Sequence, residues 1–292
     1  MKGMVVCPQP GAANVGADVL ERGGNAFDAA IATAFAQMVV DPFMCGIGGM
    51  GTLQYFDTRG AGHGMIDFHN RAGAKVVPGM WEADLVGRSD ISGYTHFEDF
   101  RSDLGYTAIM TPGTVAGFAE THRRLATWDW KDLLAPASRL ARDGYPLAAH
   151  VRDFWAKPTG PGIADGITRL KASKACADIY LRAGDTLPDV GDIIQNPDMA
   201  DTIDSLAREG AASFYTGSLA ERIAEDLEAN GGFVTGCDLA TYRTRSGKPV
   251  FGTYRGLTVA SNPPPGSGAV LIQMLQILDQ FDLAGLGHGT AE

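Results

Sequence analysis

Small and apolar residues recur with helical spacing in the N-terminal part of the chain. Over residues 12–21 they fall on one face, and Gly23-Gly24 then stops the helix. Asn25 is a favourable N-cap for a second helix over residues 26–38. That helix is so rich in alanine that we expect it to be packed closely on all sides. It ends at Asp41-Pro42, because the residue before a proline is pushed out of the α region.

After residue 51 the spacing of hydrophobic residues changes from that of a helix to the alternation of a strand. Residues 52–56 and 64–68 read as two strands joined by a polar turn. Antiparallel strands after two packed helices predict a helix layer over a sheet rather than alternating βαβ units. Residues 80–104 are polar and irregular, so we expect a surface excursion there.

The rest of the chain is mainly helical in pattern. We expect a helix that residues 111–118 open and that runs to about residue 126, further helices over residues 133–142, 200–209, 218–229 and 269–281, and a strand over residues 254–261. Residues 156–198 are rich in proline and glycine, which predicts loops with short helices. The last helix is apolar almost all round, which indicates burial against a partner chain.

The composition is that of a soluble globular protein. At 292 residues, with 45% hydrophobic and 20% charged residues, the chain can bury a sizeable core. A net charge of −10 argues against a nucleic acid or an anionic membrane as partner. No apolar run reaches the roughly 18 residues that a membrane-spanning helix needs.

The cysteines and the N-terminal residues provide evidence on the cellular location of the protein. The four cysteines show no CxxC spacing, which indicates buried free thiols rather than zinc ligands or a disulfide framework. The apolar stretch at the N-terminus is too short for a signal peptide. We therefore expect a cytoplasmic protein. A periplasmic or secreted location would require that an export signal has been removed.

Several stretches invite a chemical interpretation that the residues do not support. The glycine-rich residues 46–51 follow a helix and precede a strand, the reverse of a dinucleotide fingerprint, so we expect a packed turn and no cofactor. His63 and His69 share a strand face but form no metal-binding motif, so no metal is predicted. Ser267 lacks a GxSxG elbow, which favours helix capping or loop hydrogen bonding. A hydrolase that uses Ser267 is an alternative.

Residues 66–73 (IDFHNRAG) contain the end of a predicted strand followed by a cluster of polar residues. His69, Asn70 and Arg71 lie together there, and arginine is the natural bidentate partner of a carboxylate. From the residues alone, a structural salt bridge from Arg71 to one of the many acidic side chains is the favoured interpretation of the segment.

Four stretches, read in order, resemble the gamma-glutamyltransferase family. They are VLERGGNAFDAA at 19–30, DPFMCGIGG at 41–49, TPGTVAG at 111–117 and PPPGSG at 263–268. Family-like APA and ARDG sequences lie between them at 135–137 and 141–144. The resemblance extends over essentially the whole chain.

The resemblance implies an α+β fold, the αββα sandwich of the N-terminal-nucleophile hydrolases. Residues 1–292 would then be a large-subunit region, a single domain completed by a small subunit. The family precursor cleaves itself before a threonine (a serine in some relatives), whose hydroxyl is the nucleophile and whose α-amine is the base. Backbone N–H groups of paired glycines would stabilise the oxyanion.

In the family those elements lie in the small subunit, so no catalytic residue is assigned in this chain. Thr95-His96-Phe97 and Thr121-His122-Arg123 resemble the start of the nucleophile motif but lie too early and continue differently. We expect a processed or truncated large subunit that pairs with a small subunit. The alternative is an inactive scaffold or binding protein.

The resemblance also implies a substrate. In members that act on gamma-glutamyl compounds, an arginine directly follows the Asp-Phe pair and holds the substrate α-carboxylate. Here that position is His69, and Arg71 lies two residues later, where it faces the same way if the strand continues. His69 would hold a carboxylate in a pH-dependent manner. The small-molecule substrate is therefore a gamma-glutamyl amide of the glutathione type or another acyl amide, bound by Arg71, His69 and Asn70.

Overall fold

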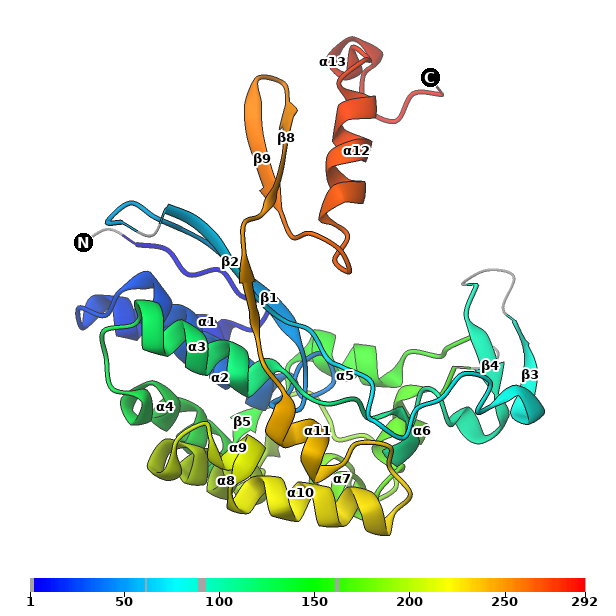
Figure 1. The fold of residues 1–292 in the computed structure, drawn as a ribbon. Coiled ribbons are helices and arrows are strands. Elements are labelled where there is room, and N and C mark those ends of the chain that lie inside the picture. The colour runs from blue at the N-terminus through cyan, green and yellow to red at the C-terminus, as the bar shows by residue number, and fades with distance from the viewer. Residues whose placement is uncertain (1–2, 61, 89–92, 161–162, 292) are drawn as a thin grey trace.

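A helix layer covers one face of an antiparallel sheet (Figure 1). The computed structural model describes residues 3–60, 62–88, 93–160 and 163–291. Strands β1 (Gly51–Asp57) and β2 (Gly62–Phe68) pair along their whole length, and β7 (Arg245–Gly247) pairs with the other edge of β2. Beneath them lie α1 (Pro10–Glu21), α2 (Ala26–Val40) and α3 (Thr114–Leu125). The predicted helix layer over a sheet is confirmed.

Helix α2 is the centre of the core. Its Ile31, Ala32, Phe35 and Ala36 have no exposed surface, which confirms the expectation of packing on all sides. The helix begins at a capping box in which the Asn25 side chain accepts from the N–H groups of residues 27 and 28. The alanines allow α1 and α4 to approach closely, because a small side chain adds little to the distance between helices.

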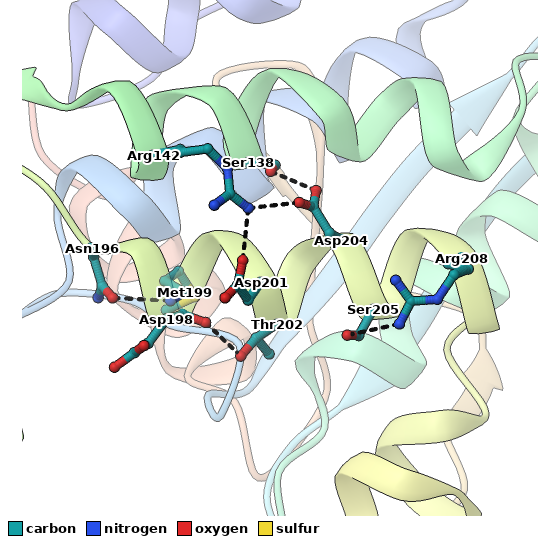
Figure 2. Close-up of polar contacts among 10 residues, drawn as sticks. All are labelled: Ser138, Arg142, Asn196, Asp198, Met199, Asp201, Thr202, Asp204, Ser205 and Arg208. Carbon is teal, nitrogen blue, oxygen red and sulfur yellow. Dashed lines mark hydrogen bonds and ion pairs between the residues drawn. The ribbon is translucent and has the colours of Figure 1, made fainter.

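A second helical layer is formed by α4 (Trp130–Asp143) and α8 (Pro197–Glu209), which pack along each other. Their apolar faces are fully buried through Leu133, Leu134, Ile203 and Leu206. Figure 2 shows the polar seam beside this contact. There Arg142 Nη2 donates to Asp201 and Asp204, each at 2.8 Å, and the Ser138 hydroxyl donates to Asp204 at 2.6 Å. The ion pairs are half exposed, so the apolar contact holds the helices together.

The remaining elements, apart from one helix of 12 residues, are short. They are β3 (Leu85–Arg88), β4 (Thr95–Phe97), β5 (Tyr145–Pro146), α5 (Ala149–Ala156), α6 (Gly166–Leu170), α7 (Lys174–Tyr180), β6 (Ile193–Ile194), α9 (Ser213–Thr216), α10 (Ser218–Ala229), α11 (Gly236–Thr241), α13 (Leu283–Leu286) and 3-10 turns at Glu82–Asp84, Glu98–Phe100 and Tyr106–Ala108. The expected loops with short helices over residues 156–198 are confirmed. Residues 80–104 are less irregular than expected, because β3 pairs with β4.

The C-terminal part corrects one predicted strand. Residues 254–261 are not a single strand: β8 (Val250–Tyr254) turns at Arg255-Gly256 into β9 (Leu257–Ser261). Both turn residues have positive φ, 48° and 77°, which is the geometry of a tight hairpin turn. Helix α12 (Gly268–Leu278) packs on this hairpin, and both stand away from the helical layers (Figure 1).

The structure also tests the predictions of buried cysteine thiols and of no membrane-spanning helix. All four cysteines are free, but Cys237 is exposed and the others are half-buried, so the expectation of buried thiols is wrong for Cys237. Within the described ranges, no helix combines the length and apolar character needed to cross a membrane.

Candidate active-site pocket

The segment that follows β2 lines a cavity of about 150 Å³, which we call the β2-end pocket. The residues around it are Asp67, His69, Asn70, Arg71, Tyr242, Arg243, Arg245 and Pro265. All three residues that the sequence singled out therefore lie at one cavity. The other members come from β2 itself, from the segment between α11 and β7, from β7 and from the triple-proline turn.

His69 is oriented by Asp67. Its ring Nδ1 lies 2.6 Å from Asp67 Oδ1, and its backbone N–H donates to the same oxygen at 2.9 Å. Burial alone would raise the pKa of Asp67, but the hydrogen bonds and charge of His69 and the charge of Arg245 hold that pKa below its usual range. An ionised carboxylate only accepts hydrogen bonds, so Nδ1 carries the proton and Nε2 is left for a ligand.

Arg71 is bound to the protein itself. Its Nη2 donates to the Arg243 carbonyl at 2.7 Å, and its guanidinium lies 5.2 Å from the centre of the Tyr242 ring. Strand β2 ends at Phe68, so Arg71 does not extend it. Its backbone forms an isolated bridge to Thr111 instead, with N–H···O distances of 3.2 and 2.8 Å.

Asn70 offers an acceptor. Its Oδ1 is buried and has no hydrogen-bond partner among the residues that the structure describes. A ligand amino or hydroxyl group can donate to it, and an unpaired buried amide oxygen otherwise costs about 1–3 kcal/mol.

Tyr242 forms the floor beneath the segment after β2. Its hydroxyl donates to the His69 carbonyl at 3.0 Å, and its ring stacks on Tyr215 with centroids 5.6 Å apart. Burial raises the pKa of Tyr242 to about 12, against the opposing charge of Arg71. The phenol is therefore a neutral donor that fixes the backbone at His69.

The TPGTVAG motif positions this segment through its glycines. A Cβ on Gly113 would lie 2.0 Å from the Phe68 carbonyl oxygen, and one on Gly117 would lie 2.3 Å from the Phe68 ring. The N–H of Gly113 donates to the Gly49 carbonyl at 2.9 Å. The glycine-rich loop is thus a packed turn against the start of α3, as predicted.

The two remaining candidates do not form a site. His63 packs its ring between Phe56 and Phe251, at centroid distances of 5.7 and 5.3 Å. Ser267 occupies the N-cap position of α12, but its hydroxyl makes no capping hydrogen bond. The prediction of helix capping by that side chain is therefore wrong.

Comparison with known proteins decides the family. The family model described as Gamma-glutamyltranspeptidase matches residues 12–292. The chain belongs to the gamma-glutamyltranspeptidase family. It is 35% identical to the glutathione hydrolase proenzyme of Bacillus subtilis (strain 168), over 97% of this chain and 45% of that protein. It is 33% identical to the acylase ACY 1 proenzyme of Pseudomonas sp. (strain V22), over 100% of this chain and 50% of that protein.

A solved member of the family gives the same result for the fold. The gamma-glutamyltranspeptidase of Helicobacter pylori superposes with a TM-score of 0.86 at 32% identity, over 100% of this chain and 79% of that chain. The family and its α+β, N-terminal-nucleophile hydrolase fold are thereby confirmed. The chain spans about half the length of the curated family members named above.

Proposed function

We propose that this chain is the large-subunit portion of an amide hydrolase or acyltransferase. In this proposal the β2-end pocket binds the acyl group of the substrate, and a small subunit supplies an N-terminal threonine as nucleophile. The observation that carries the proposal is the pocket itself: an oriented imidazole, an acceptor amide and three arginines line it. Such a set suits a small polar acyl group that carries a carboxylate.

Two substrate classes remain as candidates. A gamma-glutamyl amide accords with the names of the glutathione hydrolase relatives. Another acyl amide accords with the acylase relative, and with His69 at the position where the resemblance implies an arginine. The engagement of Arg71 with the Arg243 carbonyl supports the second class, because that guanidinium is already partly satisfied.

Unpartnered surfaces support the proposed small subunit. Residues 3–7 belong to no helix or strand, and within the described part of the chain their backbone groups have no strand partner. With α2 and the end of β1 they line a largely apolar cavity of about 750 Å³. A strand from the small subunit would fill this cavity and pair with the exposed backbone, since extended segments associate through their main-chain groups.

The test uses the full precursor. Intact mass and N-terminal sequencing should show two chains, the second beginning with threonine or serine. The purified protein should hydrolyse at least one member of a panel of acyl anilides that includes the gamma-glutamyl compound. Replacement of the first residue of the second chain by alanine should abolish turnover. An uncleaved precursor that turns over no anilide would instead support the scaffold alternative.

A further inference from the structure

Arg245 differs from the other cations of the β2-end pocket because its guanidinium is uncommitted. Arg71 donates to the Arg243 carbonyl, and Arg243 donates to the carbonyls of Ala240 and Tyr242 at 2.8 and 2.6 Å. Arg245 lines the same cavity and is exposed to solvent. In the described part of the chain, the Arg245 guanidinium takes part in no hydrogen bond or ion pair, and only its backbone is paired, with β2.

The sheet register places Arg245 beside the Asp67–His69 pair. Strand β7 runs antiparallel to β2, with Arg245 directly opposite Asp67. Directly opposite residues project from the same face of the sheet, with Cβ atoms about 4.5–5.5 Å apart. Asp67 already accepts two hydrogen bonds from His69 and forms no ion pair with Arg245 across the described strands. The Arg245 guanidinium is therefore adjacent to the oriented imidazole and available to a ligand.

We infer that Arg245 binds a carboxylate of the acyl donor, in place of the arginine that the family resemblance implies at position 69. The inference rests on the proposed function and assigns a specificity residue to it. A guanidinium matches a carboxylate with two parallel N–H···O bonds. His69 Nε2 in the neutral ring and Asn70 Oδ1 are acceptors, so these two atoms cannot donate to a carboxylate, and the Asn70 amide carries no charge.

The experiment compares four anilides in the processed, two-subunit protein. The gamma-glutamyl anilide carries a carboxylate and an ammonium group at the far end of its acyl chain. The glutaryl anilide keeps only the carboxylate, the 4-aminobutyryl anilide keeps only the ammonium, and the butyryl anilide has neither. Values of kcat and KM are measured for wild type, Arg245→Ala, Arg245→Lys and Arg71→Ala. Arg139→Ala, which changes an exposed arginine on α4, is the matched control.

Arg245→Ala should lower kcat/KM for the donors that carry a carboxylate by about 10- to 100-fold, chiefly through KM. It should leave the 4-aminobutyryl and butyryl anilides unchanged. Arg245→Lys should restore part of the loss, because the charge remains but the planar fork does not. Arg139→Ala should match wild type with all four.

Each other outcome overturns the inference in a recognisable way. An equal loss with all four anilides would mean that Arg245 only supports the sheet. A selective loss in Arg71→Ala rather than Arg245→Ala would assign the carboxylate to Arg71. A wild type that prefers the butyryl to the glutaryl anilide would show that no carboxylate is recognised. A wild type that cleaves no anilide would overturn the proposed function and this inference together.

Discussion

Asp28 is a carboxylate with no exposed surface, and it joins the start of α2 to the segment after α3. It accepts from the Asn25 N–H at 2.7 Å and from the N–H groups of Thr127 and Trp128 at 2.8 and 3.0 Å. The Thr127 hydroxyl adds a fourth hydrogen bond, at 2.6 Å. Burial alone would raise the pKa of Asp28, but these donors outweigh it and the pKa lies below its usual value.

This network predicts a pH-dependent stability. Because the pKa of Asp28 is lower in the folded than in the unfolded protein, its contribution is present above about pH 4 and is lost as the pH falls through the folded pKa. Asp28→Asn should lower the free energy of unfolding by about 2–4 kcal/mol at pH 7, since its amide group donates where the carboxylate accepts. Urea unfolding measured from about pH 7 down to about pH 2.5 should show the stability difference between wild type and Asp28→Asn shrinking below about pH 4.

Asp18→Asn is the matched control, because Asp18 forms an exposed ion pair with Arg22 on neighbouring α1. Its effect should stay within about 0.5 kcal/mol at any pH. Equal effects of the two substitutions would contradict the role assigned to the Asp28 network.

At the scale of elements, the start of α3 sets the position of the segment after β2. Gly113→Ala would drive a methyl group into the Phe68 carbonyl and the Tyr242 hydroxyl, at 2.0 and 2.3 Å. Backbone cannot yield as a flexible side chain does, so we expect a loss of about 1–3 kcal/mol in the free energy of unfolding. The substitution should also reduce turnover in the processed protein, because it displaces the backbone at His69. Thermal melts and anilide assays measure the two effects.

Gly11→Ala provides the contrast for that prediction. Gly11 lies in the first turn of α1, and a Cβ there meets nothing within 4 Å. Alanine should stabilise this helix by about 0.5–1 kcal/mol and leave turnover unchanged. A Gly113→Ala protein as stable and active as Gly11→Ala would show that the close approach at Gly113 is not required.

The elements that the sequence predicted well are those whose signals are local. The alanine run and Asn25 cap of α2 and the amphipathic periods of α8 and α10 mark these helices within a single window. The sequence predicts one strand where the hairpin β8–β9 lies, because the turn Arg255-Gly256 lacks the usual Asn-Gly or Asp-Gly signal. Positive φ at an arginine is not visible in a hydrophobic pattern.

The residues of the β2-end pocket also fall into two groups, those that a local sequence signal identifies and those that it does not. His69, Asn70 and Arg71 are contiguous, so one polar segment after a strand suffices to find them. Arg245 and Tyr242 reach the pocket only through the pairing of β7 with β2 and the packing of Tyr242 under His69. The pairing of strands that lie far apart in the chain cannot be predicted from the local pattern of a single sequence. The placement of these residues therefore had to come from the structure.

At the scale of the whole molecule, the hairpin β8–β9 and α12 present an apolar surface away from the helical layers (Figure 1). Helix α12 buries Ile272 against Gly252 of β8 and leaves most of its other apolar positions exposed. Val270, Met274 and Ile277 are each 55–57% exposed, and Phe251 of the hairpin is 51% exposed. Exposed apolar side chains that recur with helical spacing on α12 mark an interaction surface. We assign it to the proposed small subunit.

This assignment predicts how single charges on α12 affect assembly. Met274→Glu and Ile277→Glu should each weaken association of the two subunits by about 10- to 100-fold, because each side chain loses about 1.5–3 kcal/mol of apolar burial. Gln273→Glu adds the same charge at an exposed polar position of the same helix and should have little effect. The measurement is the dissociation constant of the separated subunits, followed by recovery of anilide turnover on mixing. If all three variants assemble like wild type while Met274→Glu reduces self-association of this chain, the surface binds a second copy instead.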